Sequence, residues 1–177
     1  TALHCAIMRR DEATVAALLA RGADPNAVVK AWTPTRRSSD DYHFMPALVG
    51  ASPFWLAARF TQPGVMQLLA KHGADPRFVH ESNYVLGEGY QRRTEKTTAV
   101  MAALGMGGGT AWVPLSREET EPLTLESVKL ALELGADPNV TNVNGRTALD
   151  AATTAKFAGV VRLLEAHGAQ HGTPPVR

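Results

Sequence analysis

Apolar residues recur at helical spacing in four short segments, and a glycine closes each one. A Val or Met lies two residues before each apolar group, which is the spacing of one helix face. Glycine adopts the left-handed conformation that ends a helix, so each segment predicts a helix that stops there. The four groups and their glycines are Ala17-Leu18-Leu19 with Gly22, Leu68-Leu69-Ala70 with Gly73, Leu130-Ala131-Leu132 with Gly135, and Leu163-Leu164 with Gly168.

A second helix pattern precedes each of these segments. It opens on a Thr or Ser, whose hydroxyl can accept a hydrogen bond from a free amide of the first turn. The sequence therefore predicts four pairs of short helices, with no sheet larger than a hairpin. The pairs lie at about 2–9 and 12–21, 53–60 and 63–72, 99–105 and 125–134, and 148–155 and 158–167.

The paired pattern is an internal repeat. The hexad at 1–6 recurs at 52–57, 98–103 and 147–152, and Gly22-Ala23-Asp24-Pro25-Asn26 recurs at 73–77, 135–139 and, eroded, at 168–170. This order resembles the ankyrin repeat family, with its T-P-L-H-x-A opening and its G-A-D-x-N close. The resemblance implies an all-α repeat solenoid of four helix-turn-helix repeats. The segments Pro-Thr-Arg-Arg and Ser-Pro-Phe-Trp-Leu-Ala-Ala-Arg-Phe are also similar to those of multi-repeat bacterial ankyrin proteins.

The copies start 51, 46 and 49 residues apart, whereas the repeat needs about 33. We expect two insertions, at about 27–47 and 77–95, to extend hairpin fingers, and a third, at about 107–122, to lie between two helices of one repeat. The sequence thus predicts one domain, 1–171, with repeats at about 1–51, 52–97, 98–146 and 147–171 and a tail at 172–177. Because the first hexad looks internal, further repeats are expected upstream, and Leu3, Ile7, Val15 or their neighbours are expected to expose apolar surface.

Composition narrows the classes of function. The chain has 177 residues, of which 45% are hydrophobic and 20% charged, as in soluble globular proteins, and no apolar run approaches the ~18 residues of a membrane span. A net charge of +1 gives no reason to expect nucleic acid as a partner. The single cysteine, Cys5, is expected in the core, and the compartment stays open.

The candidate catalytic and metal motifs each have a plainer interpretation. His4 and Cys5 are adjacent on a helix and point in different directions, and Gly168 ends the helix between His167 and His171. The glycines at 105–109 follow a helix and carry no Lys, so they predict a helix end and a flexible connector rather than a phosphate loop. The acidic stretch at 116–122 predicts a solvated loop. We therefore expect no enzyme activity, no cofactor and no metal.

The resemblance implies a concave binding surface, made by the finger tips and the exposed ends of the first helices. Arg, Met and aromatic residues are enriched at interface cores. Arg59 is the strongest candidate because it should project from a helix, whereas Arg36 and Arg37 adjoin Asp40 and Asp41. The candidates for partner binding are Met8, Arg9, Trp32, Arg36, Arg37, Tyr42, Arg59, Phe60, Met106 and Arg146, with Gly105, Thr154 and Ala155 at aligned positions and Phe78, Tyr90, Arg92 and Arg93 in the second finger.

The sequence thus favours a non-enzymatic scaffold that binds a protein or peptide of unidentified kind, in an oligomeric state left open. Two alternatives remain. The finger aromatics Trp32, Phe44, Tyr84 and Tyr90 could pack the fingers against each other instead of binding a partner. The finger at 32–44, Arg59 and Trp112 could also converge on a small-molecule or catalytic pocket.

Overall fold

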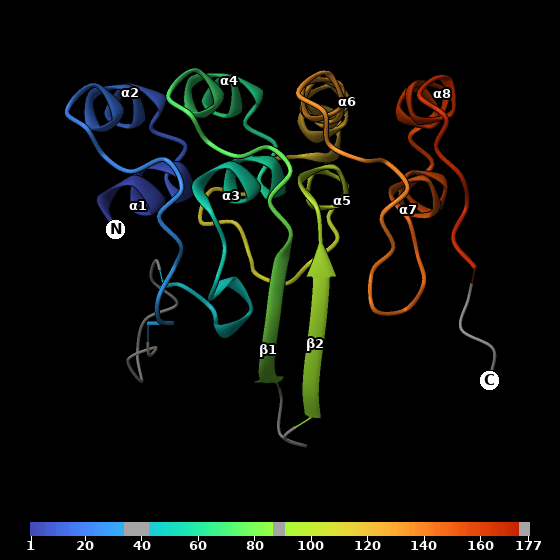
Figure 1. Ribbon diagram of the computed structural model, residues 1–177, viewed down its shortest axis with the longest axis horizontal. Helices are drawn as coiled ribbons and strands as arrows, with labels where there is room; N and C mark the ends of the chain where they lie inside the picture. Colours follow the sequence, from blue (N-terminus) through green and yellow to red (C-terminus); the bar gives the residue numbers. More distant parts are fainter. Residues whose placement is uncertain (34–42, 87–90, 174–177) are drawn as a thin grey trace.

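The computed structural model describes residues 1–33, 43–86 and 91–173, and α-helices dominate this part of the chain (Figure 1). The helices alternate between two rows, with α1, α3, α5 and α7 in one and α2, α4, α6 and α8 in the other. The elements are α1 (Ala2–Met8), α2 (Glu12–Ala20), the 3-10 helix η1 (Pro46–Leu48), α3 (Pro53–Arg59), α4 (Pro63–Lys71), β1 (His80–Leu86), β2 (Gln91–Thr97), α5 (Ala99–Ala103), α6 (Arg117–Glu133), α7 (Ala148–Ala155) and α8 (Ala158–Ala166).

The helix ends follow the predicted residues. Ser52 begins α3 by accepting a hydrogen bond from the Trp55 amide at 3.3 Å, and Pro53 occupies the first helical position, where a missing N–H costs nothing. Gly73 ends α4 with a φ of 88°. Except at the start of α6, every predicted helix boundary agrees with the structure to within about two residues.

An asparagine after a helix pair links that pair to the next. Asn26 donates to the Gly73 carbonyl at 2.8 Å and accepts from the Asp75 amide at 2.9 Å. Asn139 does the same with the Gly168 carbonyl and the Gln170 amide, at 3.1 and 2.7 Å. These side chains fix the spacing of successive helix pairs.

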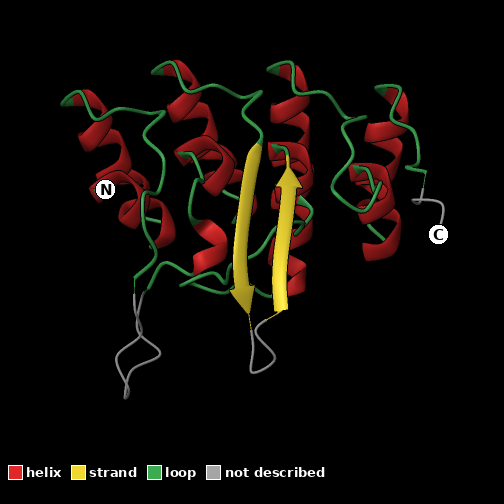
Figure 2. Cartoon of the chain, turned by 60° about the horizontal axis from the view of Figure 1, so that its bottom comes forward, coloured by secondary structure: helices red, strands yellow, loops and turns green. Residues whose placement is uncertain are grey.

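The second finger is an antiparallel hairpin of β1 and β2, paired from His80 opposite Thr97 to Leu86 opposite Gln91 (Figure 2). One face, with His80, Ser82 and Tyr84, is buried against the helices. The Trp55 indole donates to Thr97 Oγ1 at 3.2 Å, and its ring lies 4.2 Å from that of His80. Among the described residues, the hairpin is the only sheet, as predicted.

The third insertion differs from the prediction. The segment 116–122, expected as a solvated loop, is the start of α6, which begins at Arg117 rather than near 125. The reason is a capping box: the Ser116 hydroxyl accepts from the Glu119 amide at 3.2 Å, and the Glu119 carboxylate accepts from the Ser116 amide at 2.9 Å. Residues 105–115 then cross beneath α3 before α6 begins (Figure 1).

The first helix pair corrects the prediction for Cys5 and shows which residues expose apolar surface at this edge. Cys5 is exposed, not in the core, because α1 is first in its row and packs against α3 on one side only. Leu3, Ile7 and Val15 are buried in the continuous core. The apolar surface at this edge belongs to their neighbours Ala2, Cys5, Ala13 and Ala17.

Candidate partner-binding groove

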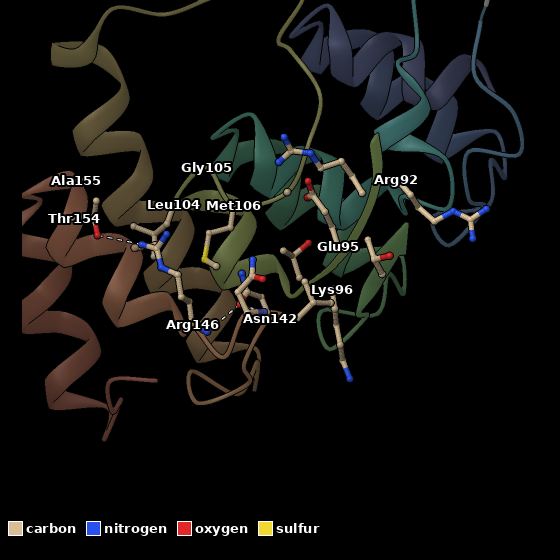
Figure 3. A pocket seen from close by; sticks show the side chains of 17 residues that line it. Arg92, Glu95, Lys96, Leu104, Gly105, Met106, Asn142, Arg146, Thr154 and Ala155 are labelled. Atoms are coloured by element: carbon tan, nitrogen blue, oxygen red, sulfur yellow. Dashed lines mark hydrogen bonds between the residues drawn. The ribbon is translucent and has the colours of Figure 1, made fainter. Parts of the chain in front are cut away.

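An open groove of about 570 Å³ lies between the second finger and the turn that leads into α7 (Figure 3). We call it the β2 groove. One wall is β2, the opposite wall is the turn at 142–146, and the floor is the C-terminal end of α5 with part of α7. The lining residues are Arg92, Arg93, Thr94, Glu95, Lys96, Thr97, Leu104, Gly105, Met106, Gly107, Asn142, Val143, Asn144, Arg146, Ala151, Thr154 and Ala155.

The β2 wall is a strand edge. Successive side chains of a strand point to opposite faces, yet all six consecutive residues from Arg92 to Thr97 line the groove. Its other edge is occupied by β1. Within the part of the chain that the structure describes, no strand pairs with the edge that faces the groove. Unpaired backbone N–H and C=O groups of β2 are therefore available there.

The opposite wall is held by its own hydrogen bonds. The Asn142 amide donates to the Arg146 carbonyl at 2.9 Å, and Asn142 Oδ1 accepts from the amides of Asn144 and Arg146. The Arg146 guanidinium donates to Thr154 Oγ1 at 3.1 Å, which holds it along the groove (Figure 3). This wall is a preformed polar surface.

The groove is basic. Four cationic side chains line it, from Arg92, Arg93, Lys96 and Arg146, against the single carboxylate of Glu95. Glu95 is further engaged, because it accepts from the Tyr84 hydroxyl at 2.7 Å. Burial and this bond raise the pKa of Tyr84 to about 12, so the phenol keeps its proton. The lining residues thus carry three more positive than negative charges.

The inserted segment closes the neighbouring part of the same side of the molecule. The Trp112 indole donates to the His43 carbonyl at 3.0 Å, and its ring lies 5.2 Å from that of Phe44. Arg59 donates to the Gly109 carbonyl at 3.1 Å. The glycines at 107–109, expected as a flexible connector, pack instead against Trp55, Ala47 and Leu48, where an added Cβ would lie 2.8, 2.3 and 2.5 Å from the nearest atom.

The structure separates the predicted binding residues into groups. Met106 and Arg146 line the β2 groove, with the aligned Gly105, Thr154 and Ala155 and the finger residues Arg92 and Arg93. The remaining candidates lie elsewhere: Met8 and Phe60 are buried, Arg9 is exposed outside the groove, Arg59 is half-buried under the insertion, Trp32 is 52% exposed on the first finger, and Arg36, Arg37 and Tyr42, like Tyr90, lie outside the described residues.

Sequence reasoning missed ten of the residues that line the groove, among them the polar Glu95, Lys96, Asn142 and Asn144. The segment 91–97 is polar throughout and has no apolar alternation, so it gives little strand signal. The Asn144-Gly145 pair, which marks a tight turn, is a clearer signal for the opposite wall.

A second cavity, of about 440 Å³, lies under the inserted segment. Its lining is largely apolar, from residues such as Phe60, Ala111 and Leu115. Among the described residues that line it, Arg10 and Arg59 are the ionisable ones. Arg10 donates to the carbonyls of Phe60 and Thr61, so its guanidinium is held in place.

The remaining polar candidates do not converge. His167 contacts the Leu163 carbonyl at 2.8 Å, whereas His171 contacts Asp150 at 2.6 Å. His4 contacts the Thr1 hydroxyl at 2.9 Å. Across residues 1–33, 43–86 and 91–173 there is no group of three His, Cys, Asp or Glu side chains able to hold a metal ion, and no helix there is long and apolar enough to cross a membrane.

Comparison with protein families gives a match at the start of the chain. No curated protein matches the chain. A family model described as the ankyrin repeat matches residues 1–30, the stretch that holds α1, α2 and the Gly-Ala-Asp-Pro-Asn close. This match supports an ankyrin-repeat family for the chain.

Proposed function

We propose that the chain is a non-enzymatic ankyrin scaffold that binds a protein or peptide in the β2 groove. Ankyrin repeats generally serve as protein-interaction scaffolds, and the family is typically non-catalytic. In this proposal the four helix pairs are four repeats of one solenoid domain, 1–171, with the insertions at about 27–47, 77–95 and 107–122. The regular order of the two helix rows supports it.

One observation supports the β2 groove as the partner-binding surface. The inserted segment covers the ends of the first two helix pairs, where Arg59 and Trp112 bond to the chain itself. The β2 groove, beside it, remains open and brings Met106, which follows α5, together with Arg146 and Thr154 at the start of the last helix pair. A partner therefore finds open, preformed surface there rather than at Arg59.

The second cavity favours a second candidate function, the binding of a small anionic molecule. Its two held guanidinium groups, Arg10 and Arg59, lie above an apolar lining, which suits an apolar ligand with a carboxylate. Its described lining offers no acid–base pair and no nucleophile with an adjacent base, so binding is the role it supports.

The test of the main proposal is selection of binders from a displayed library of random twelve-residue peptides, followed by titration of the enriched peptides. The blocking variant is Thr154→Tyr, which fills the groove, and the matched control is Thr141→Tyr, at an exposed position outside it. We expect the enriched peptides to bind Thr154→Tyr at least about tenfold more weakly and Thr141→Tyr unchanged. Equal affinity for the wild type and both variants places the binding surface elsewhere.

A further inference from the structure

We infer that the partner of the β2 groove is an extended peptide segment with alternating acidic and apolar residues, which adds to the hairpin as a third strand on the free edge of β2. The inference rests on the proposed function and deepens it, since it names the form and chemistry of the partner. Three observations carry it: the free strand edge, the difference between the two sides of β2, and the excess of positive charge.

The free edge supplies the backbone bonds. Along Arg92–Thr97, alternate residues direct N–H and C=O groups away from β1 and into the groove. Six residues in a strand span roughly 17–20 Å, so a matching segment of six to eight residues fits beside them. Strand addition to an exposed edge uses these main-chain groups for affinity and the side-chain surroundings for specificity.

The two sides of β2 differ in chemistry, which sets the pattern of the added strand. Arg92, Thr94 and Lys96 pair with the exposed Val85, Asn83 and Glu81, so they lie on the solvent face of the hairpin. The opposite face meets the helices, and there Leu104 and Met106 form an apolar floor (Figure 3). A segment with apolar side chains toward this floor places its alternate residues on the solvent face, beside Arg92 and Lys96.

Because the solvent face of β2 carries Arg92 and Lys96, we expect those alternate residues of the partner to be acidic. Directly opposed or diagonal side chains of unlike charge stabilise a strand pair, and like charges destabilise it. Lys96 Nζ lies 3.8 Å from Glu81 Oε1, and because both groups are exposed this ion pair is weak. Arg146 adds a held guanidinium at the other wall. Basic residues at these positions would instead meet Arg92 and Lys96 on the same face.

The experiment uses the full chain and an end-capped eight-residue peptide of alternating Glu and Val, labelled with fluorescein, at 0.15 M salt. A Lys and Val peptide of the same length tests charge. Two further versions carry N-methyl groups on odd or on even residues, which removes one set of alternate amide donors while keeping the side chains. We expect the Glu peptide to bind, the Lys peptide to bind at least tenfold more weakly, and only one N-methyl version to keep its affinity.

Variants locate the contacts. Arg92→Gln and Arg146→Gln are expected to weaken binding of the Glu peptide about fivefold each, whereas Arg162→Gln, an exposed position on α8, leaves it unchanged. Equal binding of the two N-methyl versions, equal binding of the Lys peptide, or no binding of the Glu peptide overturns the inference.

The two proposals fail differently. If display-selected peptides lose affinity for Thr154→Tyr while the alternating probes show no N-methyl effect, the groove is a binding site and strand addition is wrong. If the selected peptides are indifferent to Thr154→Tyr and the Glu peptide does not bind, both proposals fall.

Discussion

At the scale of single residues, three consecutive glycines decide where the insertion lies. Gly107 and Gly109 have φ values of +90° and +92°, and Gly108 sits against Ala47 and the Tyr84 hydroxyl. Each lacks the Cβ that would collide with Trp55 of α3 or with Ala47 and Leu48 of η1. The insertion can therefore approach the first two helix pairs closely enough for Gly109 to accept the Arg59 hydrogen bond.

A pair of alanine substitutions separates backbone strain from collision. Gly105 has a similar φ of +82° but nothing within 4 Å of an added Cβ, whereas at Gly109 that atom would lie 2.5 Å from Leu48. Gly105→Ala is expected to cost about 1 kcal/mol of unfolding free energy from strain alone, and Gly109→Ala about 2–4 kcal/mol. Urea denaturation of both variants measures the difference. Equal losses of unfolding free energy in the two variants would show that the insertion accommodates the added methyl group without destabilising the fold.

The buried histidines predict how stability depends on pH. Burial lowers the pKa of His80, and it lowers that of His4 to about 4, so the native state holds both rings neutral. The unfolded chain takes up protons near pH 6.5 while the native state does not, so stability is complete above pH 6.5 and falls as the pH drops toward 4. The His4 ring contributes up to about 1.4 kcal/mol per pH unit in this window, and the His80 ring contributes with the same sign.

Urea denaturation at pH 7, 6 and 5 checks this dependence. His80→Gln is expected to flatten the fall in unfolding free energy, whereas His72→Gln, at an exposed position, keeps the wild-type slope. A wild-type free energy that is constant from pH 7 to 5 would contradict the prediction.

At the scale of elements, α6 is about two turns longer than the helix predicted from the repeat pattern. It begins at Arg117, whereas the predicted helix begins near residue 125. Ser116 and Glu119 satisfy free amides at its start. Glu118 and Glu119 also lie near the positive end of the helix dipole. Arg117 donates to the Ala155 carbonyl at 3.0 Å, which ties this extension to α7.

Removing the cap should melt the extension alone. Ser116→Ala is expected to cost about 1 kcal/mol and to speed amide hydrogen exchange at 117–121 while residues 126–133 keep their protection. Glu118→Gln, in the same turn but outside the capping box, serves as the control. Uniform exchange changes along α6 would instead indicate that the extension and the repeat helix open together.

How much of these elements is readable from sequence depends on how local their causes are. The helix pairs follow from caps, closing glycines and apolar spacing within about 20 residues, and they were predicted. The capping box at 116–119 is equally local, but the acidic side chains of that stretch favoured a solvated loop. The path of the insertion depends on Leu48 and Trp55, about 50–60 residues away, and no local pattern encodes such contacts. The β2 groove is also formed by segments that are distant in sequence, so only part of its lining was predicted.

At the scale of the whole molecule, the helix pairs are not joined equally. The α3 and α5 helices pack closely, and the insertion adds a further tie across the first three pairs. The α7–α8 pair meets α5 and α6 over a smaller contact, and the β2 groove lies at that joint. In a repeat array, stability is shared between units and their interfaces, so the weakest interface opens first.

Native-state hydrogen exchange should therefore find the α7–α8 pair opening at a lower free energy than α3 and α5. The measurement is amide exchange in α7 and in α3 at rising, sub-denaturing urea concentrations. A partner bound in the β2 groove is expected to raise the opening free energy of α7, because it contacts both sides of the joint. Identical opening free energies in α3 and α7 without a partner would contradict an unequal joint.

The contact between Trp112 and His43 has a consequence for the synthesis of the chain. The two residues are 69 positions apart, and the shelf of Phe44 and Leu48 gains part of its cover from the insertion. At about 5–20 residues per second, a ribosome needs roughly 3–14 seconds to pass from one residue to the other. During that interval the first two helix pairs can form, but their apolar shelf stays open. A nascent chain halted before Trp112 thus exposes apolar surface to chaperones and to other nascent chains, whereas a chain completed past Trp112 covers it.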